Sequence, residues 1–500
     1  MMLQSATKPS HTIGSLLPAL TLAPRDAKVV VKGIQNDSRK IVNGDLFIAL
    51  AGTITNGSQY IEQAIKKGAA AVLVERNAEA RQKHEQPAPC IEVENLAQKT
   101  GEIAARFYGE PSKQLDVIAI TGTNGKTSCG RIIAELADKA QRKCMVLGTT
   151  GYGFSNELHF ASHTTPDPIE IQNLLSWGLE NGAQVASIEV SSHGLEQNRL
   201  SGVEVNTALF TNLTRDHLDY HGTMESYGHA KRKLFTLPGL NHAVINFDDA
   251  FGRELLATMP STVKSYSYSL MSDKADLYAH KFDGSFNLSA QVKTPWGKGT
   301  LNSNLLGEFN LYNLLGAVAA LCVSGISLEK VLKGIEMLEP IEGRMESFGS
   351  STQPVVIVDF AHTPDALKQA LTQLKQLQKT NNGKLICVLG CGGDRDRGKR
   401  PMMGAAADAL CDHIILTDDN PRNESPQKII NDIIAGVTGL ATYEVIHDRG
   451  EAIKAAIAGA KAQDCVLVAG KGHEQTQEYA DSSIRFCDRE VVQKILGGGV

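Results

Sequence analysis

The sequence predicts an α/β protein with mainly parallel sheets, divided into three domains. Short apolar runs rich in β-branched residues alternate with amphipathic helical patterns almost throughout, which is typical of sheets covered by helices. The chain has 500 residues, and at roughly 150 residues per domain this length favours about three domains. Apolar residues make up 42% of the chain, enough for three cores. We expect a smaller N-terminal α/β domain at 1–95, a central domain with a parallel sheet at 96–343, and a third domain at 344–500.

The charge balance argues against large polyanionic partners. The formal net charge is -5, so no broad attraction to nucleic acid or to an anionic membrane surface is expected. Residues 1–20 lack a signal-peptide pattern, and the longest apolar stretch, 314–323, has about half the length needed to span a bilayer. The nine cysteines are scattered without a CxxC pair, which is typical of incidental thiols in a reducing compartment. We therefore expect a soluble, cytoplasmic protein.

The first domain opens with patterns typical of α/β units. Residues 45–50 form an apolar run that predicts a strand, and 60–67 have a helical pattern. Gly68 fits the left-handed position that ends a helix. A further strand is expected at 70–74.

The central domain begins with a predicted helix at 98–108 and a strand at 117–120, and it runs to a predicted helix at 328–338. Within it, residues 263–306 differ, because polar and apolar residues alternate there and no helical pattern is present. Such alternation predicts half-buried strands. We expect a small antiparallel excursion at this point.

The third domain is predicted to begin near Arg344 and to form a doubly wound sheet. Its strands are expected at 355–359, 385–389, 413–417 and 465–469, with helices between them. In such sheets ligands bind beyond the carboxyl ends of the strands. We therefore expect functional side chains directly after these strands.

The strongest local signal is a phosphate-binding loop. A buried strand runs into Thr121-Gly122-Thr123-Asn124-Gly125-Lys126-Thr127, and a helix is predicted from Ser128. Glycines let backbone N–H groups surround phosphate oxygens, the lysine reaches the terminal phosphates, and the threonine hydroxyl suits Mg²⁺. Ile120 stands where the common GxxxxGK[ST] pattern has its first glycine, so the loop is shorter than usual. The alternative is a tight turn with an incidental lysine.

Further motifs follow this loop in a fixed order. They are Glu189-Val190-Ser191-Ser192-His193, the run from Thr211 to Gly222, Gly307-Glu308-Phe309-Asn310 with Asn313, Gly343-Arg344-Met345-Glu346, the run from Asp359 to Asp365, and Gly392-Gly393-Asp394-Arg395. This order resembles the Mur ligases, ATP-dependent amide-forming enzymes of peptidoglycan precursor synthesis. The resemblance extends from about Asp37 to Glu474. It implies a central ATPase domain with the phosphate loop and a Rossmann-like third domain.

Within that family the chain is most similar to the branch that adds the third residue of the stem peptide. The motif Asp419-Asn420-Pro421-Arg422 is the mark of members that use meso-diaminopimelate rather than lysine. Diaminopimelate has a distal carboxylate, and a guanidinium binds a carboxylate through two parallel hydrogen bonds. The resemblance implies Arg395 and Arg422 for that carboxylate, with Glu474 and the Gly470 carbonyl on the distal ammonium. Without the resemblance, Asn420-Pro421 would be interpreted as a turn.

The resemblance also implies two Mg²⁺ sites. One would be held by Thr127 and Glu189, the other by His217 and by Lys231 as a carbamate, that is, as N6-carboxylysine. Together with Lys126 these residues form the implied catalytic set. From the residues alone, Lys231 would belong to a solvated basic run. Glu189 comes directly at the end of an apolar strand, which favours a ligand role over the alternative of a surface carboxylate. For His217 the alternative is an ordinary hydrogen-bonded histidine.

Further substrate contacts follow from matching motif positions. Implied ATP contacts, besides residues 122–127, are Asn310, Asn313, Arg344, His362 and Asp365. Implied contacts to the UDP-linked substrate are Ser38, Thr164, Thr165, Ser191, Gln197 and Arg199. The asparagines could instead be capping or packing amides, and Asp365 a first-turn acid on a helix. Thr53-Ile54-Thr55 and His163 depart from the family pattern, which puts that wall of the uridine-substrate pocket in question.

The implied reaction is transfer of the ATP γ-phosphoryl group to the D-glutamate carboxylate of UDP-N-acetylmuramoyl-L-alanyl-D-glutamate. The amine of meso-diaminopimelate then attacks the acyl phosphate. The implied cofactors are ATP, Mg²⁺ and the lysine carbamate, the partners are small molecules, and a monomer is expected. Two other functions are compatible with the phosphate loop, a folylpolyglutamate synthase-like ligase and a nucleotide hydrolase or switch.

Overall fold

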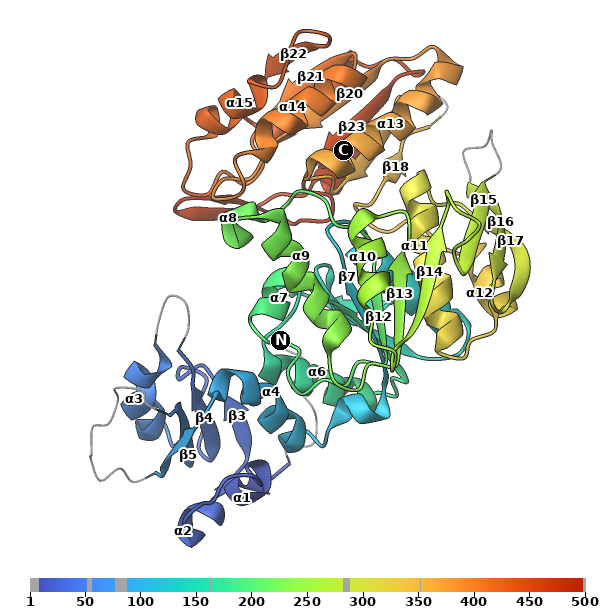
Figure 1. The fold of residues 1–500 in the computed structure, drawn as a ribbon. Coiled ribbons are helices and arrows are strands. Elements are labelled where there is room, and N and C mark those ends of the chain that lie inside the picture. Colours follow the sequence, from blue (N-terminus) through green and yellow to red (C-terminus); the bar gives the residue numbers. More distant parts are fainter. Residues whose placement is uncertain are drawn as a thin grey trace.

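The structure is a computed structural model that describes residues 9–51, 56–76, 88–161, 163–281, 288–350 and 352–497. Three helix-covered sheets follow one another along the chain, and they are arranged from bottom to top in Figure 1. The mixed α/β architecture with largely parallel sheets confirms the predicted fold class.

The first sheet is four-stranded and parallel, in the order β3 (Gly33–Gln35), β4 (Asp45–Ala49), β5 (Ala71–Glu75), β6 (Cys90–Val93). Gly68 has φ +98° and ends α3, as predicted. A separate two-stranded antiparallel sheet, formed by β1 (His11–Thr12) and β2 (Val30–Val31), precedes β3 in the chain. The helices of this region are α1 (Ile13–Leu16), α2 (Pro24–Ala27), α3 (Ile61–Lys66) and α4 (Leu96–Phe107).

The second sheet has eleven strands. In spatial order they are β10 (Glu157–His159), β9 (Gly151–Phe154), β8 (Cys144–Gly148), β11 (Val185–Glu189), β7 (Asp116–Thr121), β12 (Thr207–Phe210), β13 (His242–Asn246), β14 (Lys264–Ser269), β15 (Leu277–Lys281), β16 (Leu288–Thr294) and β17 (Gly297–Ser303). Its helices are α5 (Lys126–Lys139), α6 (Pro168–Glu180), α7 (Ser192–Glu196), α8 (Leu218–His221), α9 (Met224–Arg232), α10 (Ala250–Thr258), α11 (Glu308–Val323) and α12 (Leu328–Ile335).

Strand β7 lies near the middle of this sheet and is buried on both faces. Ile118 and Ile120 pack into one core with α5 and α11, whereas Val117 and Ala119 pack into the opposite core with α6. A parallel strand covered on both sides has a continuous apolar sequence for this reason. The rigid centre of the sheet therefore leads directly into the phosphate loop.

The predicted antiparallel excursion at 263–306 is only partly correct. β14 pairs in parallel with β13, and β15 in parallel with β14, so these strands extend the central sheet. Antiparallel pairing begins at β15–β16 and continues to β17. Alternation along a strand reports a half-buried face and does not give the direction of its neighbour, so the sequence could not separate the two cases.

The third sheet has six strands, all parallel except β18. Their order is β18 (Glu346–Phe348), β19 (Val355–Asp359), β23 (Cys465–Ala469), β20 (Leu385–Leu389), β21 (His413–Leu416), β22 (Thr442–Val445), and a separate hairpin is formed by β24 (Thr476–Tyr479) and β25 (Ser482–Arg485). The four predicted strands are present. The helices are α13 (Pro364–Asn381), α14 (Lys399–Leu410), α15 (Pro426–Ile434), α16 (Arg449–Gly459) and α17 (Asp488–Leu496).

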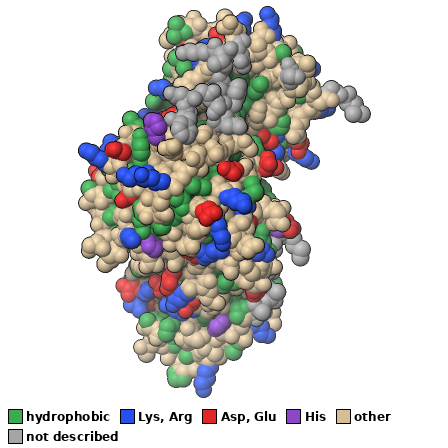
Figure 2. All heavy atoms as spheres, turned by 90° about the vertical axis from the view of Figure 1, so that its right-hand side faces the viewer, with side chains coloured by type: hydrophobic (Ala, Val, Ile, Leu, Met, Phe, Trp, Pro, Cys, Tyr) green, Lys and Arg blue, Asp and Glu red, His purple; other side chains and the backbone are tan. Residues whose placement is uncertain are grey.

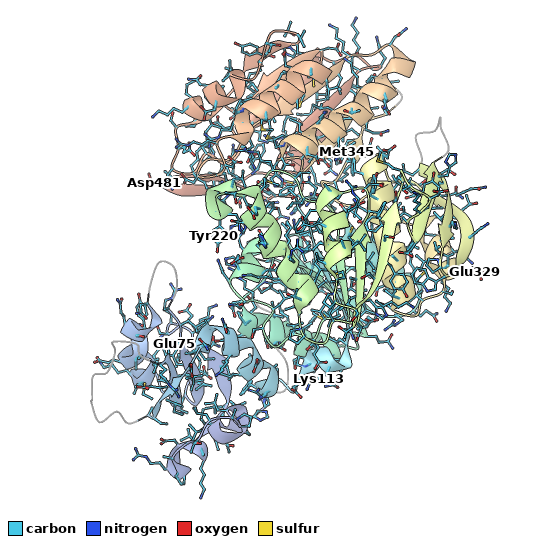
Figure 3. The ribbon with its side chains drawn as sticks, viewed as in Figure 1. Glu75, Lys113, Tyr220, Glu329, Met345 and Asp481 are labelled. Carbon is cyan, nitrogen blue, oxygen red and sulfur yellow. The ribbon has the colours of Figure 1, made fainter. Side chains whose placement is uncertain are left out.

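The junction between the second and third sheets contains Met345, which is labelled there in Figure 3. On the face shown in Figure 2, basic and acidic side chains are interspersed rather than gathered by sign. Among the described residues, no helix has the length and apolar character needed to cross a membrane.

Candidate functional site

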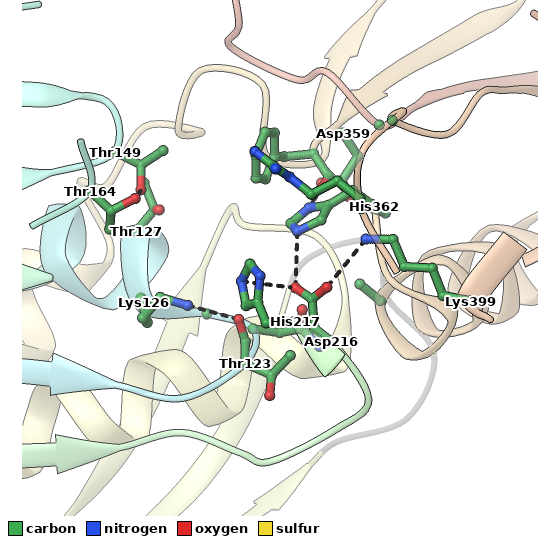
Figure 4. A pocket seen from close by; sticks show the side chains of 18 of the residues that line it. Thr123, Lys126, Thr127, Thr149, Thr164, Asp216, His217, Asp359, His362 and Lys399 are labelled. Atoms are coloured by element: carbon green, nitrogen blue, oxygen red, sulfur yellow. Dashed lines mark hydrogen bonds and ion pairs between the residues drawn. The ribbon is translucent and has the colours of Figure 1, made fainter. Parts of the chain in front are cut away.

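A cleft lies where the central sheet faces the third sheet. Its walls come from the loops after β7, β8, β11 and β12 on one side and after β19, β20, β21 and β23 on the other. These are the carboxyl ends of parallel strands in both sheets, the position at which doubly wound proteins bind ligands. Figure 4 shows the central part of this cleft.

The phosphate loop has the predicted strand–turn–helix geometry, although α5 begins at Lys126 rather than Ser128. Gly122 and Gly125 have φ +150° and +87°. A Cβ on Gly122 would lie 1.9 Å from Thr211 Oγ1, and one on Gly125 would lie 2.5 Å from Asn313 Oδ1. Both glycines are therefore required by backbone conformation and by close contacts. Lys126 Nζ donates to the carbonyls of Gly122 and Thr123 at 2.9 Å, and burial lowers its pKa.

Glu189 lies at the end of β11 and is buried, so its interpretation as a surface carboxylate is wrong. It accepts hydrogen bonds from Thr127 Oγ1 at 2.9 Å, from Thr149 N at 3.0 Å and from Thr149 Oγ1 at 3.1 Å. Arg344 Nη2 donates to Thr127 Oγ1 at 3.0 Å. A carboxylate and a hydroxyl thus converge at the end of the phosphate loop, and oxygen atoms of these kinds are the ligands that Mg²⁺ prefers.

Lys231 is 1% exposed, so the interpretation as part of a solvated basic face is wrong for this residue. Its Nζ donates to the Gly122 carbonyl at 2.7 Å and lies 4.4 Å from the centre of the Tyr227 ring. Burial lowers the pKa of this ammonium well below its ordinary value, and the charge of Lys126 acts in the same direction. Both effects favour the neutral amine, which is the nucleophilic form.

His217 faces the same loop from the segment after β12. Burial lowers the pKa of its imidazole to about 3, so the ring is neutral near pH 7. Its Nε2 lies 3.3 Å from Asp216 Oδ2, so an ordinary hydrogen-bonded histidine stays a possible interpretation. Among the described residues, no group of three or more His, Cys, Asp or Glu side chains is arranged to hold a metal ion.

Asp216 is a site residue that sequence reasoning passed over. It is buried and pairs with Lys399 Nζ at 3.2 Å and with His362 Nε2 at 3.6 Å, both from the third domain (Figure 4). Burial works to raise the pKa of Asp216, yet the hydrogen bond from His362 and the charge of Lys399 hold it well below its ordinary value. The available signal was its position beside His217. Lys399 gave none, because a lysine in a first helical turn is usually solvated.

The other expected ATP contacts surround the loop. Arg344 lies across the Phe360 ring at 4.4 Å, and Asp365 accepts from Asn124 Nδ2 at 3.3 Å. Asn313 Nδ2 donates to Asn310 Oδ1 at 3.0 Å, and Asn310 Nδ2 donates to the Leu306 carbonyl at 2.7 Å. These amides therefore lie together on α11 beside Gly125, with packing contacts of their own.

The third-domain wall contains the residues expected to bind an amino acid. Arg395, Asp419, Asn420, Arg422, Gly470 and Glu474 all line the cleft. Asn420 Nδ2 donates to Glu474 Oε2 at 2.9 Å. The buried Lys471, which received no role from the sequence, donates to Asn420 Oδ1 at 2.9 Å and to Glu474 Oε2 at 2.7 Å. Pro421 lies behind this wall, in a separate hollow.

The residues expected to hold the UDP-linked substrate are less concentrated. Thr164 and Ser191 line the cleft, and Thr165 Oγ1 donates to the Glu189 carbonyl at 2.9 Å. Arg199 Nη1 donates to the Thr165 carbonyl at 2.5 Å and is joined to Gln197. Ser38 lies apart in the first domain, where its Oγ donates to Gln63 Oε1 at 2.8 Å. His163 is exposed, and Thr53-Ile54-Thr55 lie outside the described residues.

Three family models match the chain. The Mur ligase family, catalytic domain, matches residues 30–108, the Mur ligase middle domain matches 120–321, and the Mur ligase, glutamate ligase domain matches 343–472. A relative from Coxiella burnetii, named UDP-N-acetylmuramoyl-L-alanyl-D-glutamate–2,6-diaminopimelate ligase, is 47% identical over 94% of this chain and 96% of its own length.

Solved structures extend the comparison. The structure of a UDP-N-acetylmuramoyl-L-alanyl-D-glutamate–2,6-diaminopimelate ligase is 37% identical with a TM-score of 0.70, and the match covers 98% of this chain and 99% of that one. Mycobacterium tuberculosis folylpolyglutamate synthase complexed with ADP and AMPPCP shares the fold at 18% identity and a TM-score of 0.62, over 75% of this chain and 92% of that one. With family models along its length and a near full-length relative at 47% identity, the chain belongs to the Mur ligase family.

Proposed function

We propose that this chain is an ATP-dependent ligase that joins meso-2,6-diaminopimelate to UDP-N-acetylmuramoyl-L-alanyl-D-glutamate in peptidoglycan precursor synthesis. The observation that carries the proposal is one cleft with a phosphate loop on one wall and two guanidinium groups, Arg395 and Arg422, on the other. The names of the relatives at 44–47% identity support this substrate pair. We assign the UDP-linked substrate to 1–95, ATP to 96–343 and the amino acid to 344–500.

The proposed chemistry has two steps. An oxygen of the D-glutamate side-chain carboxylate attacks the γ-phosphorus of ATP, the bond to the bridging oxygen breaks, and ADP leaves. The amine of diaminopimelate then attacks the acyl carbon, phosphate leaves, and the amine loses a proton. Water would hydrolyse the acyl phosphate, so the third domain has to cover the cleft during the reaction.

We assign binding of the polyphosphate to residues 122–127. The N-terminus of α5 and the backbone N–H groups of the loop favour an anion, and Lys126 adds a positive charge. Thr127 and Glu189 fit an Mg²⁺ ion, because their oxygens are 2.9 Å apart at the end of the loop. Bound there, the ion would neutralise phosphate charge as the phosphoryl group moves.

We propose that Lys231 is carbamylated and holds a second Mg²⁺ together with His217. The neutral amine adds to the carbon of CO₂, an N–C bond forms, and one proton leaves. The buried amine with its lowered pKa supports this step, because it is nucleophilic near neutral pH. Loss of activity in CO₂-depleted buffer, with recovery on adding bicarbonate, would support the modification. Full activity without CO₂, in protein whose Lys231 has an unmodified mass, would exclude the modification.

For diaminopimelate we propose that Arg395 and Arg422 bind the distal carboxylate, and that Glu474 and the Gly470 carbonyl bind the distal ammonium. Asp419, Asn420 and Pro421 shape this wall. Arg422→Ala should raise the KM for diaminopimelate at least 10-fold while changing the KM for ATP less than about 3-fold, as expected for loss of a bidentate contact. Equal losses for both substrates would remove the proposed role.

We assign Asn310 and Asn313 to the adenine edge, and Arg344, His362 and Asp365 to the nucleotide on closure. Ser38, Thr164, Thr165, Ser191, Gln197 and Arg199 are proposed contacts of the UDP-linked substrate. A cytoplasmic monomer is proposed as the working form. The nine free cysteines support a reducing compartment. Light scattering would test whether the mass in solution is that of a monomer.

The decisive experiment measures phosphate release with ATP, Mg²⁺, the UDP-linked dipeptide and a panel of amines. Release that requires both the dipeptide and diaminopimelate is expected. Release that depends on a folate would favour a folylpolyglutamate synthase-like ligase, and release without any amine would favour a nucleotide hydrolase. Labelling the D-glutamate carboxylate with ¹⁸O should transfer one labelled oxygen to phosphate, and absence of that label would exclude an acyl phosphate.

A further inference from the structure

The two loops that carry Arg395 and Arg422 are joined by a buried ion pair that lies behind them. Arg400, near the start of α14, is 1% exposed. Its Nη2 donates to Glu424 Oε1 at 2.8 Å, and its Nη1 donates to Glu424 Oε2 at 3.1 Å. The same guanidinium donates to the Gly392 carbonyl at 3.1 Å and to Asp432 Oδ2 at 2.9 Å. Arg400 thus holds the loop after β20 and the loop after β21 at once.

Glu424 completes the connection from the other side. Its Oε1 accepts from the Asp394 backbone N–H at 2.7 Å, and its Oε2 lies 3.0 Å from Arg397 Nη2. The hydrogen bonds from Arg400 are the main cause that lowers the pKa of Glu424 to about 2. The carboxylate is therefore ionised at neutral pH, and charge-assisted bonds of this kind are the stronger ones.

Both recognition arginines are held by the backbone that this pair fixes. Arg422 Nη1 donates to the Gly393 carbonyl at 2.8 Å, and Arg395 Nη1 donates to the Asp394 carbonyl at 3.0 Å. A Cβ on Gly393 would lie 1.8 Å from the Pro421 carbonyl oxygen, so the two loops touch through their backbones. Arg422 itself has φ +51°, a conformation that costs energy for a residue with a side chain.

Two like charges have to be kept together at this wall. Burial lowers the pKa of Arg422, and the neighbouring charge of Arg395 lowers it further. The repulsion between the guanidiniums favours separation of the loops until a carboxylate binds between them. A connection at the base of the loops opposes that separation and keeps the site organised in advance, which reduces the cost of binding.

We propose that Arg400 and Glu424 form a positioning pair that sets the spacing of the Arg395 and Arg422 guanidiniums, and so determines the preference for an amine that carries a distal carboxylate. This inference rests on the proposed diaminopimelate ligase function. Arg400 and Glu424 act through the two recognition arginines and are not catalytic residues.

The test compares Glu424→Gln, which keeps the shape and removes the charge, with the unaltered protein. The KM for diaminopimelate should rise about 10- to 100-fold, on the scale found when residues that orient metal ligands are changed. The KM values for ATP and the UDP-linked dipeptide should change less than about 3-fold. L-Lysine lacks the distal carboxylate, so kcat/KM for lysine should stay constant and discrimination against lysine should fall by the same factor.

The control is Asp408→Asn, on the same helix as Arg400, α14. Asp408 is a buried carboxylate that accepts from Thr438 N, Thr438 Oγ1 and Ala441 N, away from both loops. The Asp408→Asn substitution should lower thermal stability without changing the preference between diaminopimelate and lysine. Arg400→Lys keeps the positive charge and loses the two parallel hydrogen bonds of the guanidinium, so an intermediate loss of discrimination is expected. If Glu424→Gln does not fold, the Arg400→Lys variant takes its place in the test.

The outcomes separate this inference from the proposed function. If the unaltered protein requires diaminopimelate and Glu424→Gln raises all three KM values equally, or none, the positioning role is overturned. If the unaltered protein does not require diaminopimelate, the proposed function itself fails. A selective rise in the diaminopimelate KM, absent from Asp408→Asn, supports the pair.

Discussion

The central domain meets its two neighbours through interfaces of opposite character. Toward the first domain, α4, which follows that domain in the chain and packs into the core of its sheet, contacts α6 and the segment after α7 through glycine and apolar contacts. Toward the third domain, the loops after β7 and β12 meet the loops after β19 and β20 through charged and polar side chains. The difference indicates which junction is fixed and which one can open.

The first interface depends on close backbone contact. A Cβ on Gly101 of α4 would lie 1.9 Å from the Ser201 carbonyl oxygen, and one on Gly202 would lie 2.4 Å from the Gly101 carbonyl oxygen. Ile169 of α6 packs into the same core as Ile103 and the strands of the first sheet. Separating these surfaces would expose apolar side chains to water, which is unfavourable. We infer that the first and central domains move as one body.

The second interface is built from side chains that water can solvate. Arg215 pairs with Asp396 at 3.0 Å, Asp216 pairs with Lys399 and His362, and Asn124 contacts Thr363 and Asp365. Apolar packing there includes partly buried side chains such as Phe309. Polar groups regain hydrogen bonds with water when such an interface opens, so hinge motion of the third domain is the expected gate for substrates.

The largest effect is expected from Asp216→Ala in the polar interface. This change leaves the Lys399 ammonium buried without its carboxylate, which costs about 3–5 kcal/mol and corresponds to about 10²–10⁴-fold in kcat/KM. The third domain should move away, because opening solvates the lysine, and the radius of gyration from small-angle scattering should rise. The double variant Asp216→Ala with Lys399→Met leaves no unpaired charge and should return toward the closed radius. An unchanged radius in the single variant would contradict a polar latch.

The next effect concerns the fixed interface. Gly101→Ala forces α4 away from the Ser201 carbonyl and should lower stability by about 1–3 kcal/mol, the cost of overpacking. The KM for ATP should not change below the melting temperature. Gly459 is also helical and has no atom within 4 Å of an added Cβ, so Gly459→Ala is the matched control and should be neutral or stabilising. If Gly101→Ala altered kinetics and left stability unchanged, the two interfaces would not differ as described.

The same contrast explains what the sequence could and could not predict. The phosphate loop is contiguous, so its spacing alone carries its chemistry, and the structure has the expected strand–loop–helix around residues 117–139. Asn420-Pro421-Arg422 is also contiguous, so the family resemblance could be matched to it residue by residue, although its spacing alone indicates only a turn. Asp216 and Lys399 are brought together by domain packing, and no local pattern records a contact between distant segments. Lys231 has a sequence neighbourhood typical of solvent, yet it is buried because α9 packs against the phosphate loop. Site residues on one loop were predictable, whereas partners across domains were not.

A pH-dependent effect is expected from His473, which lies in the polar interface beside the Phe360 ring. Burial, with the charges of Arg344 and Arg489, lowers its pKa to about 3. Between about pH 3 and the ordinary value near 6.5, an opened or unfolded chain binds a proton that the closed form excludes. Stability from this group is therefore complete above pH 6.5 and is lost as pH falls, by at most about 1.4 kcal/mol per unit. Melting temperatures from pH 5 to 7.5 should fall less steeply toward acid for His473→Asn than for the unaltered protein. Parallel curves would contradict this assignment.

The smallest effect is expected from Arg215→Gln. The Arg215 side chain is 39% exposed, so its pair with Asp396 contributes about 0.2–1 kcal/mol to closure, or up to about 5-fold in kcat/KM. Because salt screens exposed charges, with a Debye length of about 10 Å at 0.1 M and about 3 Å at 1 M, the difference from the unaltered protein should shrink as NaCl is raised. Lys454→Gln is the control, since it removes an exposed pair with Glu451 on α16, away from the interface. A salt-dependent loss in Arg215→Gln alone would assign part of closure to surface charge, whereas a loss independent of salt would mean that Arg215 acts on the neighbouring His217 segment instead.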